Sequence, residues 1–469
     1  MPREIRFHNT LTRRTERLES FEPGHARIYT CGPTVYNYAH IGNFRTFVFE
    51  DVMCRTLRAF GYHVTQVMNL TDIDDRTIAA SNAEGISLRE FTDRYAQAFF
   101  EDLATLGVEH AEHYPRATDY VPQMVALVQR LMERGHTYVQ DGSTYFRIAS
   151  LPGYGKLSGT DLAQVKAGAR VDADDYDKED ARDFVLWKAR KEGEPFWDTP
   201  LGEGRPGWHL ECSAMAMDLL GASIDIHAGA VDLIFPHHEN EIAQSEGATG
   251  KPFVRTWLHA EHLVVEGQKM SKRLGNFYTL RDLVEQGYSP LAIRYLLVSV
   301  PYRQKLNFTF DGLRGAEAVV ERIANTLRRL AHTPAASGEG SLAAVAIEAF
   351  HADFDDSLAD DLNTARALAA FHTLLTRVNQ ALDADGISTA IRSGLDGALA
   401  RVSAVLGILP PPEGGGEDAE IDALVAERNA ARASRDFARA DAIRAELTAR
   451  GIVLEDTPHG TVWHRGKPA

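Results

Sequence analysis

The chain has 469 residues, a formal net charge of −16, 44% hydrophobic and 25% charged residues, and three cysteines. A chain of this length can bury several cores, and its composition is that of an ordinary globular protein, not of a disordered or collagen-like one. The acidic excess argues against a protein coated with nucleic acid, although a local basic face could still bind RNA. No apolar run reaches membrane-spanning length, the amino terminus lacks a signal-peptide core, and the cysteines are too few for a disulfide framework. We therefore expect a cytoplasmic protein with no membrane partner.

The stretch from Tyr29 to Thr46 carries polar residues where a strand passes into a helix. Residues 27–30 alternate between polar and apolar side chains, which predicts a short strand, and a helical pattern begins near Asn43 and ends at Gly61. At such a junction, free backbone N–H groups and the helix dipole favour phosphate. The sequence contains no GxxxxGK[ST] loop. We therefore predict a nucleotide site of another kind, with His40 and Asn43 on one side of the first helical turn.

The patterns that follow predict alternating strands and helices, and then helices alone. The expected elements, in chain order, are a strand over 63–70, helices over 87–106 and 118–134, a hairpin over 137–148 turning at Asp141-Gly142, a helix over 209–219, a strand over 223–228, a helix over 237–245, a strand within 253–265 and a helix near 280–284. Helical periodicity without strands is expected over 289–409, with a loop at 333–340. The acidic run 172–180 is interpreted as a solvated loop.

The end of the chain is set apart by a linker at 410–416, which is rich in proline and glycine. Beyond it we expect a helix over 421–449 and a small hairpin over 451–465. Four arginines are spaced three or four apart along that helix, which would place them on one face: Arg428, Arg432, Arg435 and Arg439. A solvated helix explains these arginines as well as contact with RNA does.

Together these patterns predict an α/β protein. A Rossmann-like catalytic domain would be split by an inserted connective subdomain and followed by an α-helical bundle and a small C-terminal α+β domain. The expected boundaries are 1–115 and 226–305 for the two halves of the catalytic domain, 116–225 for the inserted subdomain, 306–409 for the bundle, 410–418 for the linker and 419–469 for the C-terminal domain.

Several short motifs, in their order along the chain, resemble those of cysteinyl-tRNA synthetases. His40-Ile41-Gly42-Asn43 resembles the HIGH signature of class I aminoacyl-tRNA synthetases, and Lys269-Met270-Ser271-Lys272-Arg273 resembles the second signature of that class. The further matching motifs are Cys31–Tyr36, Met68–Asp75, Gly207–Ser213 and Phe235–Glu241. The resemblance covers nearly the whole chain. The last HIGH position is Asn43 and not histidine, so its side chain can donate a hydrogen bond but cannot carry a positive charge.

The resemblance implies one zinc ion per chain, held by Cys31, Cys212, His237 and Glu241. From the residues alone, His237 and Glu241 stand four apart on one helix face, and zinc accepts thiolate, imidazole and carboxylate ligands. Without the resemblance the site stays open, because a lone cysteine is usually a small buried hydrophobe. We expect Cys54 in the core and His238 as a support of the site. Zinc would select cysteine over serine by the softness of its thiol, without an editing domain.

The resemblance also assigns the other candidate site residues. Those expected to act on the phosphates are His40, Asn43, Lys269 and Lys272. Those expected to bind ATP, which would bring Mg²⁺ with it, are His40, Gly42, Asn43, Gly229, Asp232, Lys269 and Lys272. Those expected to line the amino-acid pocket are Thr34, Asn69, Thr71 and Trp208. For the pocket residues and for Gly229 and Asp232, packing around the site explains the residue as well as direct contact does.

The function implied is that of a cysteine–tRNA ligase. Such an enzyme joins L-cysteine to ATP as cysteinyl-adenylate, releases pyrophosphate and passes the acyl group to the 3′-terminal adenosine of tRNA(Cys). The bundle and the C-terminal domain would recognise the tRNA, with the arginine helix and Trp463 at the anticodon. A monomer is expected.

Two other functions remain open. One is the ligation of cysteine to glucosaminyl-inositol in mycothiol synthesis, by an enzyme with the same catalytic half. The other is a non-catalytic relative that binds nucleotide or RNA. The segment after the linker separates the first alternative from the tRNA ligase, and the intact signature residues argue against the second.

Overall fold

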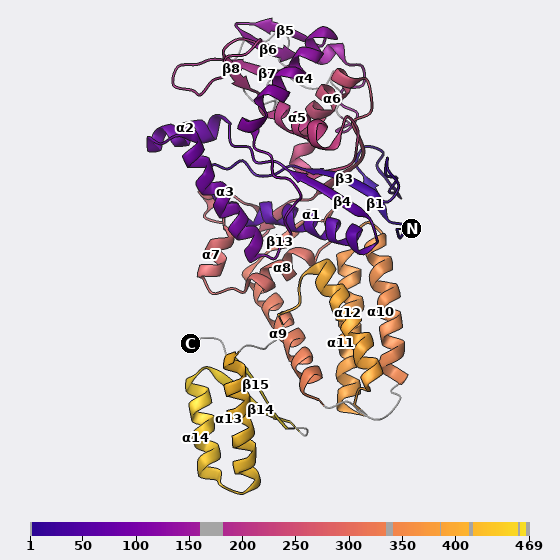
Figure 1. The fold of residues 1–469 in the computed structure, drawn as a ribbon, viewed down its shortest axis with the longest axis vertical. Coiled ribbons are helices and arrows are strands. Elements are labelled where there is room, and N and C mark those ends of the chain that lie inside the picture. The colour runs from indigo at the N-terminus through magenta and orange to yellow at the C-terminus, as the bar shows by residue number, and fades with distance from the viewer. Residues whose placement is uncertain are drawn as a thin grey trace. The chain divides into compact units, whose positions relative to one another are not determined.

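A computed structural model describes residues 2–159, 182–333, 341–384, 386–411, 416–457 and 460–465 (Figure 1). The chain forms two compact units, which are described separately. Unit 1 comprises Met1–Ala316, Phe354–Leu368 and Ala404–Gly407, and unit 2 comprises Glu317–Asp353, Ala369–Ser403 and Ile408–Ala469. The acidic run 172–180, most of the loop 333–340 and residues 412–415 of the linker lie outside the described residues.

The centre of unit 1 is a parallel sheet with the strand order β10-β9-β3-β4. Its strands are β3 (His25–Thr30), β4 (His63–Met68), β9 (Ile224–Ala230) and β10 (Val254–Ala260). Two helices lie on opposite sides of this sheet, α1 (Ile41–Ala59) and α5 (Trp208–Leu220) (Figure 1). The expected βαβ unit is confirmed. Because β3 has β4 on one side and β9 on the other, the carboxyl ends of these strands flank a switch in strand order, where open α/β sheets bind ligands.

Helix α1 begins with a reciprocal cap. The ring Nδ1 of His40 accepts a hydrogen bond from the backbone N–H of Asn43 at 3.1 Å, and Asn43 Oδ1 accepts one from the backbone N–H of His40 at 3.1 Å. This arrangement satisfies two of the amide groups that a helix start leaves without partners. Buried Phe44 and Val48 then hold the helix on the sheet, and Gly61 follows its end with φ 89°. The asparagine in the HIGH-like motif therefore has a structural role.

Glu50, on the same helix, is fully buried. Among the described residues, neither of its carboxylate oxygens has a hydrogen-bond partner. Burial raises the pKa of Glu50 well above its ordinary value, because the charged form is poorly solvated there. In the unfolded chain this carboxyl ionises near pH 4.3. In the folded state Glu50 therefore keeps its proton to higher pH. Its contribution to the free energy of unfolding is fully present below the unfolded pKa of about 4.3 and is lost as the pH rises toward the folded pKa.

We expect Glu50→Gln to stabilise the protein at pH 8 by about 1–3 kcal/mol, because the amide removes the ionisation that the buried site opposes. The gain should be smaller at pH 5. The measurement is the urea-unfolding midpoint at both pH values. Glu192→Gln, at an exposed carboxylate, is the control and should leave the midpoint unchanged at either pH. A Glu50→Gln midpoint below that of the wild type at pH 8 would contradict the expectation.

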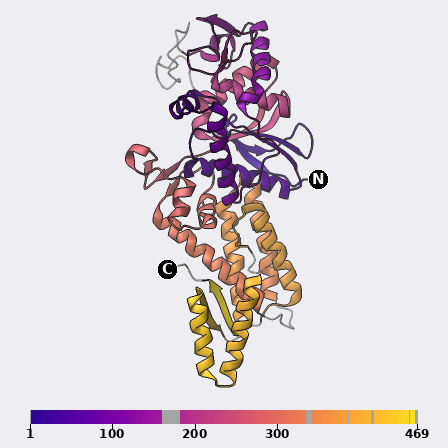
Figure 2. The same cartoon turned by 60° about the vertical axis from the view of Figure 1, so that its left-hand side comes forward.

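Between β4 and β9 the chain forms helices and a second sheet (Figure 2). The helices are α2 (Asp75–Glu84), α3 (Leu88–Thr105) and α4 (Val121–Glu133), and the antiparallel sheet contains β5 (Thr137–Gln140), β6 (Ser143–Phe146), β7 (Phe184–Ala189) and β8 (Gly204–Pro206). The hairpin expected at Asp141-Gly142 is confirmed, with positive φ at both residues, as a two-residue turn of type I′ requires. Helix α2 was not predicted, although Asp74 and Thr77 form a capping box at its start.

The remainder of unit 1 contains a three-stranded sheet with the order β12-β11-β13. Its strands are β11 (Leu263–Val265), β12 (Gln268–Lys269) and β13 (Leu306–Phe308). The helices in this part of the chain are α6 (Glu239–Thr249), α7 (Leu280–Glu285) and α8 (Pro290–Val298). The expectation of no strand over 289–409 is wrong, because β13 pairs in parallel with β11. Three residues are too few to show a strand period in the sequence.

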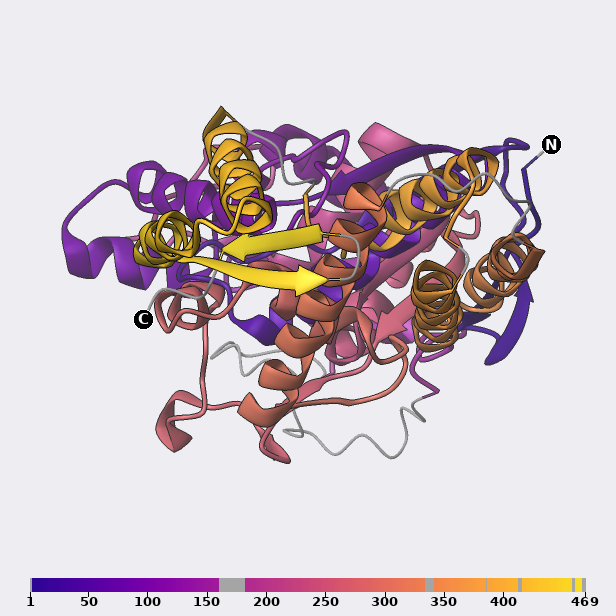
Figure 3. The same cartoon turned by 90° about the horizontal axis from the view of Figure 1, so that it is seen from below.

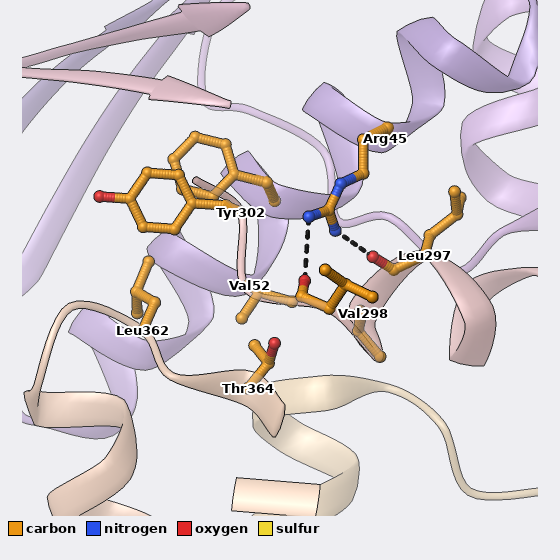
Figure 4. A pocket seen from close by; sticks show the side chains of 9 residues that line it. Arg45, Val52, Leu297, Val298, Tyr302, Leu362 and Thr364 are labelled. Carbon is orange, nitrogen blue, oxygen red and sulfur yellow. Dashed lines mark hydrogen bonds between the residues drawn. The ribbon is translucent and has the colours of Figure 1, made fainter. Parts of the chain in front are cut away.

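Arg45 joins α1 to the chain after α8. Its guanidinium donates to the backbone oxygen of Leu297 (Figure 4). It also donates to the backbone oxygens of Val300 and Pro301, each at 2.9 Å. Burial lowers the pKa of Arg45 to about 10. The hollow beside it is lined mainly by apolar side chains and includes none of the predicted site residues. We interpret Arg45 as a structural link.

Helices dominate the rest of the chain. They are α9 (Phe310–His332), α10 (Ser341–Ala359), α11 (Thr364–Asp383), α12 (Thr389–Leu406), α13 (Gly416–Ala433) and α14 (Phe437–Ala449). The predicted run of helices over this region is confirmed. Within the described segments, no helix combines the length and the apolar character that crossing a bilayer requires.

The single helix expected over 421–449 is wrong. The chain leaves the helical path at Arg435, where φ is 61°, and Asp436 caps a new helix by accepting from the Arg439 backbone N–H at 3.1 Å. Helices α13 and α14 pack side by side with a hairpin of β14 (Ile452–Thr457) and β15 (Gly460–Arg465) (Figure 3).

The predicted arginine face does not exist, because the break separates its members. Arg428 is 3% exposed, and its guanidinium donates to Thr461 Oγ1 at 3.0 Å. Trp463 is also buried in this small core, and its indole N–H donates to Asp422 Oδ1 at 2.7 Å. Arg428 and Trp463 therefore stabilise the C-terminal fold.

Candidate metal centre and active site

Four buried side chains from separate elements meet near the carboxyl end of β3. Cys31 follows β3, Cys212 lies on α5, His237 lies in the turn Ile234–His238, and Glu241 lies on α6. One ligand atom from each lies within 4.8 Å of all the others. The two sulfur atoms are 4.0 Å apart, and His237 Nε2 lies 3.1 Å from Glu241 Oε1. The structure thus brings together the whole predicted ligand set.

The backbone around Cys31 accounts for its position. Its N–H donates to the Ala228 oxygen of β9 at 3.3 Å. A Cβ on the next residue, Gly32, would lie 1.8 Å from the Asn69 oxygen, so only glycine fits. The amide N–H of Gly32 instead donates to the side-chain oxygen of Asn69 at 2.9 Å. Asn69 therefore supports the cysteine loop.

Histidines surround the cluster and orient it. His209 Nδ1 lies 2.9 Å from His237 Nδ1, which leaves His237 Nε2 toward the cluster, and His227 Nε2 lies 2.9 Å from Glu241 Oε2. Such outer partners commonly fix the orientation of metal ligands. Sequence reasoning missed His227. A histidine inside a predicted strand of the central sheet is a signal that could have found it.

A second donor set overlaps the first. It consists of Cys31, His227, His238 and Glu241. His238 Nε2 lies 3.3 Å from Cys31 Sγ, while its Nδ1 lies 2.8 Å from His259 Nε2. The supporting role expected of His238 stays a prediction. The set with two cysteines is the better zinc site, because it offers two soft thiolates in place of one.

The charges in the cluster suit a cation. Burial opposes ionisation of Glu241, but the charge and hydrogen bond of His227 hold its pKa at about 2. Burial likewise opposes ionisation of Cys212, yet the hydrogen bond from Cys31 lowers its pKa to about 6. Two sulfurs bound to one tetrahedral zinc would lie about 3.8 Å apart, close to the separation of Cys31 and Cys212. Both the donor chemistry and the spacing therefore fit zinc.

The predicted amino-acid pocket adjoins this cluster. Thr34 and Thr71 pair across the ends of β3 and β4, and the ring of Trp208 lies 4.3 Å from that of His237, centroid to centroid. The hydroxyl of Thr71 donates to Glu211 Oε2 at 2.7 Å. Sequence reasoning missed Glu211, which is fully buried and whose other oxygen has no hydrogen-bond partner among the described residues. Its position next to Cys212 was the available signal.

His40 presents a defined donor at the start of α1. Burial lowers the pKa of His40, although the nearby charge of Asp232 acts in the opposite direction, so the ring is neutral at pH 7. Because Nδ1 accepts from the Asn43 backbone, the proton of the neutral ring lies on Nε2. Gly42 lies close to the second signature, since a Cβ there would be 3.0 Å from the methyl carbon of Met270.

The loop of the second signature is held by a residue outside the motif. Asn276 Oδ1 accepts from the backbone N–H of Ser271 at 2.8 Å, and Asn276 Nδ2 donates to the Lys269 oxygen at 3.3 Å. Lys269 ends β12 and is exposed. The side chain of Lys272 lies outside the described part of the chain. Gly229 lies near the end of β9, where a Cβ would be 3.0 Å from the His238 ring.

The catalytic region matches a known family profile. The profile described as "tRNA synthetases class I (C) catalytic domain" covers residues 17–318. The methionyl-tRNA synthetase of Mycobacterium tuberculosis bound to methionyl-adenylate has the same fold, with a TM-score of 0.60 at 13% identity over 81% of this chain and 92% of that one. The parallel sheet and the two signatures therefore belong to a class I aminoacyl-tRNA synthetase.

The particular family follows from the rest of the chain. A DALR domain profile matches residues 353–410, and a profile described as "Cysteinyl-tRNA ligase anticodon binding domain" matches residues 415–463. The cysteine–tRNA ligase of Solibacter usitatus is 53% identical over 98% of this chain and 99% of its own length. That of Leptospira interrogans is 49% identical over the same shares. The chain belongs to the cysteinyl-tRNA synthetase family, as the motifs predicted.

Proposed function

We propose that the chain joins L-cysteine to tRNA(Cys) in two steps, with ATP as the source of energy and zinc as the selector of the amino acid. The observation that carries the proposal is the convergence of Cys31, Cys212, His237 and Glu241 in one buried cluster. When bound, zinc would offer a soft position that prefers the cysteine thiolate to the serine hydroxyl. His209 and His227 would keep His237 and Glu241 oriented toward it.

In the first step a carboxylate oxygen of cysteine attacks the α-phosphorus of ATP, and the bond to pyrophosphate breaks. The neutral His40 ring would donate from Nε2 to a phosphate oxygen, with the amide of Asn43 as a second donor. Lys269 and Lys272 would neutralise the charge that grows on the leaving group, which departs with Mg²⁺. Trp208, packed on His237, and Thr71 would line the amino-acid side of the site.

In the second step the terminal adenosine of the tRNA attacks the acyl carbon, and AMP leaves. For this step we propose the boundaries predicted above: 1–115 and 226–305 as the catalytic domain, 116–225 as its insertion, 306–409 as a tRNA-binding bundle, 410–418 as a linker and 419–469 as the anticodon-binding domain. We also propose a monomeric, cytoplasmic enzyme. The match of residues 415–463 to an anticodon-binding profile supports a tRNA partner over glucosaminyl-inositol.

The test is cysteine-dependent exchange of pyrophosphate into ATP, followed by transfer of labelled cysteine to tRNA(Cys) or to glucosaminyl-inositol. We expect exchange with cysteine and not with serine, and transfer to the tRNA alone. Transfer to the sugar amine would favour the mycothiol alternative. Absence of exchange from metal-loaded protein would favour the non-catalytic alternative.

A further inference from the structure

Tyr38, which precedes His40 by two residues, is an exposed aromatic side chain with a fixed position. It is 41% exposed, yet its ring packs edge-on against Tyr95 of α3, with the centroids 5.4 Å apart and the planes at 74°. Large aromatic side chains usually lose more of their surface than this on folding. The residue therefore leaves part of its surface open to solvent, two residues before His40, where the nucleotide is proposed to bind.

An arginine on another element of the fold packs against the Tyr38 ring. The guanidinium carbon of Arg281, on α7, lies 5.0 Å from the centroid of the Tyr38 ring. Arg281 is itself fixed by hydrogen bonds from Nη2 to the backbone oxygen of Ala98 at 3.1 Å and to the carboxylate of Glu101 at 2.8 Å, and by an ion pair between Nε and the carboxylate of Asp102 at 2.9 Å. The loop before α1, helix α3 and helix α7 thus meet at this ring, and we call Tyr38, Tyr95 and Arg281 the tyrosine platform.

A second tyrosine of the same loop, Tyr36, contacts an arginine on helix α2. The Arg76 guanidinium lies 5.1 Å from the ring centroid of Tyr36, and its Nη1 donates to the Tyr36 hydroxyl at 3.3 Å. The Arg76 side chain is 62% exposed and lies 3.5 Å from a carboxylate oxygen of Asp74. Proteins bind single-stranded nucleic acid with exposed aromatic rings, which stack on the bases, and with arginines, which lie near the phosphates.

We propose that the tyrosine platform stacks on a base of the unpaired 3′ end of the tRNA, next to the terminal adenosine, with Arg76 near its phosphates. This inference rests on the function proposed above, because that function requires an unpaired RNA end to reach the adenylate beside His40. Unpaired bases have free faces that can stack on the Tyr38 ring, and the RNA backbone is anionic, which matches the exposed Arg76 at Tyr36, two residues before Tyr38. The adenine of ATP is the competing occupant.

The test compares the two steps of the reaction in Tyr38→Ala, Tyr38→Leu and Tyr38→Phe. Loss of one stacked base should lower kcat/KM for tRNA(Cys) by about 5- to 150-fold in the alanine and leucine variants. ATP–pyrophosphate exchange, which needs no tRNA, should change by less than about twofold. The phenylalanine variant keeps the ring and should retain transfer. The leucine variant keeps much of the apolar volume, so it separates the loss of the ring from the loss of packing that alanine also causes.

Phe21→Ala is the matched control. Phe21 is 40% exposed and also contacts an arginine, since the Arg255 guanidinium lies 3.9 Å from its ring centroid, but it follows β2 (Arg14–Arg17) and is remote in sequence from both signatures. It should leave both steps unchanged. A rise in KM for ATP with an equal loss of exchange in Tyr38→Leu would overturn the inference in favour of adenine. Unchanged transfer in that variant would overturn it as well. If the wild type shows no exchange, the proposed function itself fails.

Discussion

Cys31→Ser should lose zinc and cysteine-dependent exchange together. The hydroxyl of serine is a poor zinc ligand, and Cys31 belongs to both donor sets in the cluster, so neither set survives the change intact. Loss of outer partners of metal ligands alone costs about 10- to 100-fold, and loss of a ligand should cost at least about 100-fold in exchange. The measurements are metal content by elemental analysis and the rate of pyrophosphate exchange at saturating ATP.

Cys54→Ala is the matched control for that change. Cys54 is a buried cysteine on α1 that belongs to neither donor set in the described part of the chain. Its variant should keep about one zinc per chain and its selectivity for cysteine over serine. A Cys31→Ser protein that lacks zinc and still activates cysteine at the wild-type rate would remove the metal from the proposed mechanism.

Lys272→Ala should slow adenylate formation by about 10²- to 10³-fold, because a cation that meets charge developing on the leaving group acts mainly in the transition state. Cysteine binding should stay near the wild-type value, since the metal cluster is untouched. Rapid-quench measurement of adenylate formation and equilibrium binding of cysteine separate the two effects.

Lys251→Ala, at an exposed lysine outside the second signature, is the control and should be neutral. A Lys272→Ala variant with a normal adenylate rate would assign the leaving-group charge to other residues. Equal losses in the rate and in cysteine affinity would indicate general damage to the fold instead.

The elements that could be predicted from the sequence are those determined by residues close to one another along the chain. The strand over 27–30, the helix from near Asn43 and the turn at Asp141-Gly142 each follow from side-chain period or from turn chemistry within a few residues. The break at Arg435 was equally local, since Asp436 is a good N-cap, but the regular spacing of arginines favoured one long helix. A spacing rule gives no warning when one position takes a left-handed conformation.

The site was less predictable where it depends on residues far apart in sequence. The four ligands were assigned through family motifs, because nothing within the sequence alone places Cys31 beside Cys212. The histidines around them, His227 and His259, lie on neighbouring strands and meet the cluster only once β9 and β10 are paired. Trp463 was expected at the anticodon for a related reason. Its structural role becomes visible only when the hydrogen bond from its indole N–H to Asp422 is known.

The reciprocal cap at the start of α1 orients the His40 ring before any nucleotide binds. The two hydrogen bonds between His40 and Asn43 that begin the helix also set the ring's tautomer and direction. A nucleotide arriving there would meet a donor already aimed, so little reorganisation would accompany the chemistry. Because the donor is uncharged, its strength should hardly vary between pH 7 and pH 9. Any alkaline decline of the reaction would then have to originate in another group.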